Sequence, residues 1–159
     1  MEPPKLVSMD EFETWEREFV PWVQAMHYDG WVLIGRGYKV PVKENKQELE
    51  KYNYSRVQKE EYLAEKRMIS LIYESVVKDI LNQLPECETS QKLWNALCDK
   101  NREHVEMIKK RKALMVKEFE NFTMIKGETL KQVINRYCCL MVEMRKHKIE
   151  ESTERKSEN

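Results

Sequence analysis

The chain has 159 residues, which is enough for one domain, or for a tight pair of helical subdomains, with a real hydrophobic core. Its 28 Lys and Arg equal its 28 Asp and Glu, and this balance argues against a protein whose main task is to bind nucleic acid over its whole surface. Four Gly and five Pro are too few for the many turns of a β-sandwich or barrel, so the composition favours long helices.

The first predicted element is an amphipathic helix that starts at a capping box formed by Ser8 and Glu11. One helical face carries its large apolar residues, Phe12, Trp15, Phe19, Trp22 and Met26. Pro21 is expected to kink or break this helix, because proline lacks the backbone donor and clashes with the preceding turn. Gly30 is expected to end the element. The apolar run 31–34 fits either a strand-like extension or a helical turn.

The middle of the chain is predicted to hold a polar surface loop, 42–56, followed by a long helix from about Val57 to Leu84. The loop has room for one helical turn. Pro85 ends the long helix. Its apolar stripe is Met68, Ile69, Ile72, Val76, Ile80 and Leu84, which Leu63 would extend.

Three further helices are predicted in the C-terminal half. Thr89 caps a short helix, a charged connection covers 99–106, and the next helix ends before Gly127. A second capping box, Thr129 and Gln132, starts the last helix. The apolar residues of the three are Leu93, Trp94, Leu97 and Cys98; Val105, Ile108, Met115, Phe119 and Phe122; and Leu130, Val133, Ile134, Tyr137, Leu140, Met141 and Met144.

Together these elements predict an all-α fold, a compact bundle of about five helices. Residues 1–8 form an N-terminal arm, and the helical domain covers 9–149. A division of that domain into subdomains of about 9–86 and 87–149 is an open alternative. The tail 150–159 has no apolar residue and is predicted to be disordered.

No group of residues in the sequence has the spacing of a catalytic, cofactor-binding or metal-binding site. The three histidines are far apart, and no Gly-Lys-Ser/Thr phosphate loop or paired Cys/His zinc spacing occurs. The cysteines are predicted to be reduced thiols, used as small buried side chains: Cys87, Cys98, Cys138 and Cys139. We therefore expect no enzyme, no cofactor, no metal and no small-molecule substrate. No run of 18 apolar residues predicts a membrane span.

A basic cluster is the clearest candidate for a binding surface. Its members are Lys109, Lys110, Arg111, Lys112 and Lys117. A solvated helix surface is the favoured interpretation, because four consecutive cations wrap around a helix. Contact with an RNA backbone and nuclear import are the alternatives. Trp15 and Trp94 fit core positions better than base stacking, whereas Trp31 is free to line a groove for a protein partner.

Four blocks, in this order, resemble the Gag polypeptide of copia-type LTR retrotransposons, in its capsid-forming part. They are FETWEREFVPWVQAM with Trp15, followed by Trp31 and Gly37-Tyr38; the helix with Ile69, Ile72 and Val76; TSQKLWNAL with Trp94; and Leu114 to Met144, with Glu118, Phe119, Phe122, Met124, Lys126, Gly127, Glu128, Thr129, Arg136 and Tyr137. The similarity covers roughly residues 10–149 and is carried by the order and spacing of the blocks.

The resemblance implies an α-helical capsid-like domain that self-associates and packages RNA with help from a later region. The family usually continues into a Cys-x2-Cys-x4-His-x4-Cys zinc knuckle, and these 159 residues lack it. The expectation is therefore a Gag fragment, a decayed copy or a host gene derived from one.

The predicted function is that of a non-enzymatic structural protein with weak contacts between its own copies. An RNA-binding module using Lys109 to Lys117 and a host-derived protein-interaction adaptor are the alternatives. The expected location is cytoplasmic, with a nuclear location as the alternative.

Overall fold

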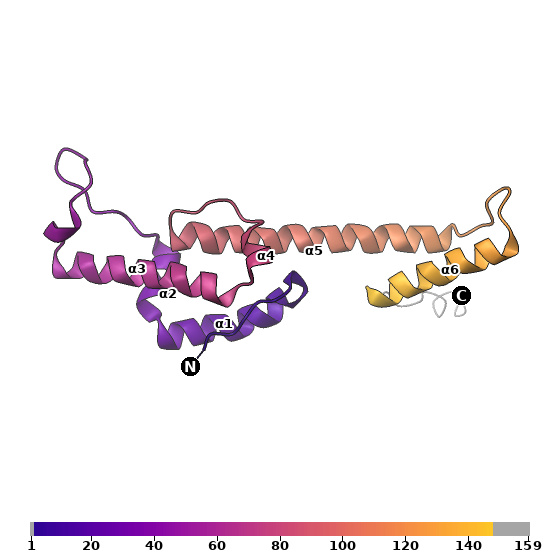
Figure 1. Ribbon diagram of the computed structural model, residues 1–159, viewed down its shortest axis with the longest axis horizontal. Coiled ribbons are helices and arrows are strands. Elements are labelled where there is room, and N and C mark those ends of the chain that lie inside the picture. The colour runs from indigo at the N-terminus through magenta and orange to yellow at the C-terminus, as the bar shows by residue number, and fades with distance from the viewer. Residues whose placement is uncertain (1, 148–159) are drawn as a thin grey trace, which may run out of the picture. The chain divides into compact units, whose positions relative to one another are not determined.

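The computed structural model describes residues 2–147, and over this range the chain is helical with no strand (Figure 1). The all-α prediction is confirmed for these residues, with six α-helices in place of about five. The α-helices are α1 (Phe12–Met26), α2 (Tyr28–Arg36), α3 (Arg56–Ser75), α4 (Lys78–Leu81), α5 (Ser90–Glu120) and α6 (Leu130–Lys146), and the 3₁₀ helices are η1 (Met9–Glu11) and η2 (Lys51–Asn53). The predicted disorder of 150–159 lies outside the described residues.

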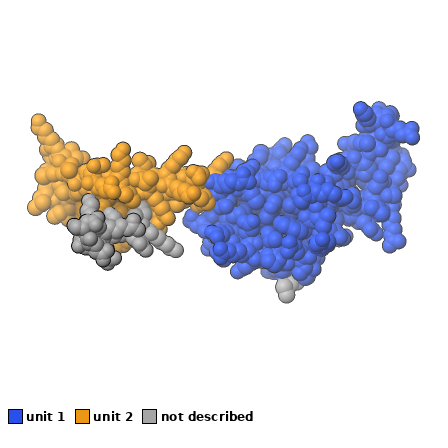
Figure 2. All heavy atoms as spheres, turned by 180° about the vertical axis from the view of Figure 1, so that it is seen from behind, with its two compact units in different colours: residues 1–102 blue, residues 103–159 orange. Residues whose placement is uncertain are grey.

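The chain divides into two units, residues 1–102 and 103–159, which Figure 2 colours separately. Unit 1 contains α1 to α4 and the start of α5, and unit 2 contains the end of α5 and all of α6. The domain bounds expected from the sequence stay a prediction.

The start of the chain corrects three predictions. Ser8 caps η1, accepting the N–H of Asp10 at 3.3 Å, and not the longer helix. α1 is not broken at Pro21 but runs through it to Met26, and Phe19 and Val23 on its apolar face are fully buried; a kink at Pro21 stays a prediction. Gly30 does not end a helix but lies within α2, which also contains residues 31–34. A Cβ on Gly30 would lie 3.0 Å from the Met68 sulfur, so the glycine allows α2 to approach α3 closely.

The long predicted helix 57–84 is wrong beyond Ser75, where the N-terminal arm pairs with the chain and the helix is interrupted. The N–H of Leu6 donates to Ser75 O at 2.7 Å, and the N–H of Val77 donates to Leu6 O at 3.1 Å. Val76 between them is extended, with φ −119° and ψ 134°, so α3 stops and the short α4 follows. Leu6 itself is fully buried, which makes the arm part of the core.

Aromatic side chains form the centre of the unit 1 core. Trp15 stacks on Phe19 with ring centroids 4.4 Å apart, and it lies 5.9 Å from Trp94. Trp31 meets Trp94 edge-on at 5.7 Å. The three tryptophans singled out from the sequence are therefore packed together here. Buried aliphatic residues from α3 to α5 complete this core, among them Met68, Ile72, Ile80, Leu93 and Leu97.

α5 is one continuous helix of 31 residues, where the sequence predicted a short helix, a charged connection and a second helix. The predicted cap is present, since Thr89 Oγ1 accepts the N–H of Lys92 at 3.2 Å. Residues 90–120 contain no Gly and no Pro. Ion pairs between residues one helical turn apart, Asp99 with Arg102 and Glu106 with Lys109, lie along the charged stretch. A charged segment rich in helix formers continues a helix when no breaking residue interrupts it.

Candidate interaction surface

Unit 2 has a small core between the end of α5 and α6. Among the described residues of unit 2, Met115, Leu140 and Met144 are buried in it, with Phe119, Phe122 and Met141 packed against them. Across the described part of unit 2, nine large apolar side chains are exposed, against three that are buried; in unit 1 the numbers are ten and sixteen. The described part of unit 2 thus exposes three times as many large apolar side chains as it buries, and where these side chains lie next to one another they are candidates for a surface that binds a partner.

The Arg136 guanidinium organises the turn that joins α5 to α6. It donates to both carboxylate oxygens of Glu128, at 3.0 and 3.1 Å, and to Thr123 O. Its guanidinium carbon lies 4.4 Å from the centre of the Phe122 ring, and Tyr137 packs edge-on against that ring at 5.2 Å. A bidentate guanidinium–carboxylate pair of this kind fixes geometry better than a single ion pair.

Two local features complete this turn. Gly127 has φ +83°, a conformation that a residue with a Cβ rarely adopts. The predicted capping box at the start of α6 is present, because Thr129 Oγ1 accepts the N–H of Gln132 and the Gln132 side chain accepts the N–H of Thr129. Of the residues that carried the family resemblance at this corner, Phe122, Glu128, Arg136 and Tyr137 are in contact with one another.

The Arg136 guanidinium holds the pKa of the Glu128 carboxyl below its usual value of 4.5, and the N–H of Ile125, which donates to this carboxylate at 2.9 Å, acts in the same direction. A carboxylate with these partners is favoured over its protonated form in the folded state. The stability of unit 2 is thereby linked to pH.

We expect this link to appear as a loss of stability in acid. Because the pKa of Glu128 is lower in the folded chain, the unfolded chain takes up the proton first as the pH falls below 4.5. The stabilisation is complete above that pH and is lost as the pH falls through the folded-state pKa. Glu128→Gln should lack this component, so that the unfolding free energies of variant and wild type converge between pH 7 and pH 3.

Urea unfolding followed by far-UV circular dichroism measures this difference. Glu120→Gln, at the exposed end of α5, is the matched control and should follow the wild type at each pH. A constant offset between Glu128→Gln and wild type across the range would contradict the expected link.

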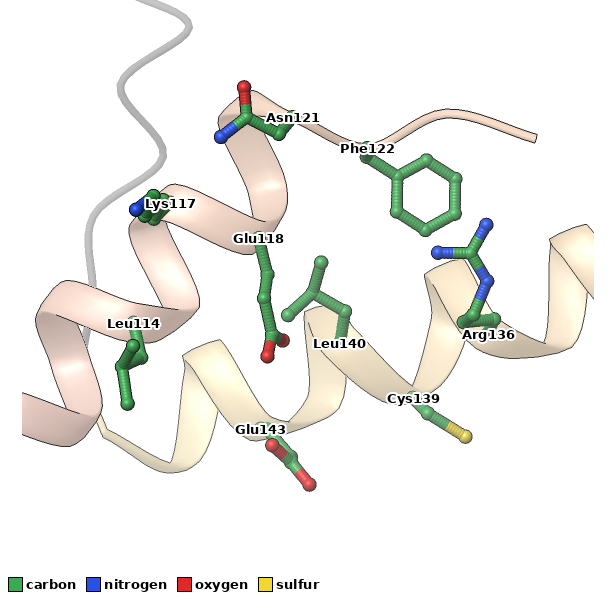
Figure 3. A pocket seen from close by; sticks show the side chains of 9 residues that line it. All are labelled: Leu114, Lys117, Glu118, Asn121, Phe122, Arg136, Cys139, Leu140 and Glu143. Carbon is green, nitrogen blue, oxygen red and sulfur yellow. The ribbon is translucent and has the colours of Figure 1, made fainter. Parts of the chain in front are cut away.

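An open groove of about 610 Å³ lies between the end of α5 and α6 (Figure 3). Its apolar lining is Leu114, Phe122 and Leu140, and its polar lining includes Lys117, Glu118, Arg136 and Glu143. In Figure 3 the side chains of Glu118 and Leu140 point into the space between the two helices. Since Arg136 is already paired with Glu128, the groove presents two carboxylates and one ammonium to a partner.

A second surface of unit 2 is an apolar stripe on α6. We define the α6 stripe as Leu130, Ile134, Tyr137 and Met141, spaced four, three and four residues apart. The sequence predicted these residues on the packed side of the helix. In the structure Leu130 is 71% exposed, Ile134 53% and Tyr137 41%, and only Met141 is partly buried. The core of unit 2 is too small to cover them.

The basic cluster lies on α5 within unit 2. Lys109, Lys110, Arg111 and Lys117 are exposed, Lys112 is partly buried, and Lys109 approaches Glu106 at 3.8 Å. Successive residues of a helix point about 100° apart, so Arg111 and Lys112 lie away from the side that carries Lys110 and Lys117. Over residues 103–147, ten Lys and Arg compare with six Asp and Glu. RNA contact through this cluster stays a prediction.

The cysteines are free thiols, and two of them correct the sequence prediction. Cys87 and Cys98 are partly buried, and burial raises the pKa of the Cys98 thiol to about 11. Cys138 and Cys139, expected to be buried, are exposed on α6. They lie outside the core because Leu140 and Met144 occupy the buried face of this helix.

The sequence predictions missed one structural contact, a buried carboxylate on α3 that caps the start of α5. Glu65 on α3 is 1% exposed. Its Oε1 accepts the N–H of Ser90 at 2.6 Å, and its Oε2 accepts the Ser90 hydroxyl at 2.7 Å. A carboxylate at a helix N-terminus also interacts favourably with the helix dipole. The available signal was its position, because Glu65 lies seven residues before Ile72 and thus on the apolar stripe of α3.

Within residues 2–147, no three His, Cys, Asp or Glu side chains lie close enough together to hold a metal ion. No helix in the same range is long and apolar enough to cross a membrane.

The chain matched no protein-family model, no curated protein and no solved structure in three separate comparisons.

Proposed function

We propose that this chain is a non-enzymatic assembly protein that associates with copies of itself through unit 2, as a capsid-like domain of the copia-type Gag kind would. The single observation that carries the proposal is the imbalance in unit 2, where nine large apolar side chains are exposed and three are buried among the described residues. Small units with so little core usually gain stability by oligomerisation, a metal or disulfides. Its described cysteines are free, which leaves association as the simplest of these.

The charge balance of the chain supports the same proposal. Equal numbers of cations and anions in the whole chain keep the overall repulsion between copies small, while the excess of cations in the described part of unit 2 requires its contacts to match cations with carboxylates. The exposed apolar residues of α6 are separated along the chain by cations, as Leu130, Ile134 and Tyr137 are by Lys131 and Arg136, a pattern suited to weak, repeated contacts rather than to one large permanent interface.

Sedimentation velocity across a hundredfold range of protein concentration tests the proposal. We expect the weight-average sedimentation coefficient to rise with concentration, in the micromolar to millimolar range typical of small interfaces. Leu130→Glu together with Ile134→Glu should shift the rise to higher concentration, since both side chains are exposed and their loss leaves the monomer intact. A chain that stays monomeric at every concentration would rule the proposed function out.

A further inference from the structure

Unit 2 presents two different candidate surfaces to its surroundings, the groove and the α6 stripe. Residues two positions apart on a helix point about 200° apart. Cys139 and Glu143, which line the groove, therefore face away from Tyr137 and Met141 of the stripe. No residue of the stripe lines the groove. One copy can thus use both surfaces at the same time.

The charges beside the two surfaces are of opposite sign. Lys131 lies one turn before Ile134, and Arg145 lies one turn after Met141, so each end of the stripe has an exposed cation. The groove presents Glu118 from α5 and Glu143 from α6 beside two cations, the Lys117 ammonium and the Arg136 guanidinium. The Arg136 guanidinium is paired with Glu128, so the two lining carboxylates face one cation that has no such pair in the groove. Opposite charges on complementary surfaces favour the matched pair and disfavour other pairings.

A symmetric pairing of two α6 stripes has the opposite problem. If the two helices ran antiparallel, Lys131 of each copy would lie near Arg145 of the other, and if they ran parallel, like residues would meet. Cations face cations in both arrangements, and no acidic residue in the described part of α6 lies beside the stripe to offset them. The electrostatic arrangement therefore selects against an α6–α6 dimer.

We propose that the α6 stripe of one copy docks into the groove of a second copy. This rests on the proposed function, because it specifies which surfaces of unit 2 make the self-association. The groove is large enough, since a cavity of about 150 Å³ already holds a benzene-sized group and this one has about 610 Å³. Ile134 and the exposed side of Tyr137, whose ring also packs on Phe122 of its own copy, would enter it beside Leu114 and Leu140 of the second copy. Lys131 would then be directed at Glu143.

Such a contact is heterologous, because each copy gives a stripe to one neighbour and receives a stripe from another. Repeating it leaves no copy saturated until a ring closes, and an unclosed series grows as a filament. The predicted assembly is therefore polar and extendable, and it does not stop at a two-fold dimer.

A complementation experiment with the full chain tests this geometry. Ile134→Glu blocks the stripe and keeps the groove, while Leu114→Glu blocks the groove and keeps the stripe; both positions are exposed, so the fold is retained. Each variant alone should associate at least ~10-fold more weakly than the wild type. Mixed in equal amounts, the two should form a 1:1 heterodimer that does not grow further. Val142→Glu, which places the same charge on an exposed site of α6 in neither surface, should behave as the wild type.

A charge exchange checks the docking orientation. Lys131→Glu is added to the Leu114→Glu variant, which keeps the stripe, and should weaken its pairing with the Ile134→Glu variant, which keeps the groove. Adding Glu143→Lys to the Ile134→Glu variant should then restore the pairing. Restoration needs the two residues to meet across the contact, which a merely structural role would not produce.

The outcomes separate the two proposals. If the wild type never associates, the proposed function fails and this inference fails with it. If the wild type associates but the mixed variants remain monomeric, or if Leu114→Glu alone still dimerises, the stripe does not enter the groove and only the present inference is overturned. If the substitutions change the sedimentation coefficient equally at every protein concentration, the stripe packs against its own chain, and this result would also overturn the inference.

Discussion

Glu65→Ala is expected to lower the free energy of unfolding of unit 1 by about 2–5 kcal/mol. The carboxylate is fully enclosed, and its two oxygens bond the backbone N–H and the hydroxyl of Ser90. Removing it leaves two buried polar groups at the start of α5 without partners, and the loss is larger than that of an ordinary cap because the acceptor is charged. All four tryptophans lie in unit 1, so urea unfolding followed by tryptophan fluorescence reports this unit separately.

Two further variants test the explanation. Glu60→Ala removes an exposed carboxylate of the same helix, which pairs only with Arg56, and should cost about 0.5 kcal/mol or less. Replacing both partners, Glu65→Met with Ser90→Ala, should recover part of the lost stability, because no hydroxyl is then left unsatisfied. A Glu65→Ala protein as stable as Glu60→Ala would show that the cap from α3 does not hold α5.

Leu6→Ala is expected to destabilise unit 1 by about 2–5 kcal/mol, as a large-to-small change in a packed core does. The result would be unusual for a residue so close to a chain end, where substitutions are commonly tolerated. Leu6 is nevertheless fully buried, and its backbone joins the two sides of the break between α3 and α4. The same fluorescence measurement reports it.

Val7→Ala provides the matched control. The neighbouring side chain is 62% exposed, so its truncation should change the unfolding free energy by about 0.5 kcal/mol or less. Equal effects of the two substitutions would mean that the arm contributes by its backbone alone and that its side-chain burial is unimportant.

Local features of this chain could be predicted from the sequence, and features set by distant partners could not. The Thr129 capping box, the Thr89 cap and the apolar face of α1 depend on neighbouring residues, and the structure contains them. The end of α3 at Ser75 could not be read from its apolar stripe, because it is caused by Leu6, which lies some 70 residues earlier. A periodic pattern shows which face is buried but not what will interrupt it.

The candidate site shows the same division. The sequence marked four motif positions here, Phe122, Glu128, Arg136 and Tyr137. Their spacing along the chain does not show that the Arg136 guanidinium contacts both the Glu128 carboxylate and the Phe122 ring, as it does in the structure. The stripe on α6 was expected to be packed because its residues are apolar. Apolar spacing cannot distinguish a helix that buries its face within the chain from one that leaves the face for a partner.

The continuity of α5 has a consequence for cooperativity. Between Leu97 in unit 1 and Met115 in unit 2, no residue of this helix is buried, so beyond Cys98 the two hydrophobic cores contribute little to its middle, and charged pairs run along its surface. A segment of that kind melts at little free-energy cost and separates the chain into two foldons. Damage to the core of one unit should therefore fray α5 as far as this stretch and stop there, so that a strained assembly contact could open unit 2 while the aromatic core of unit 1 stays folded.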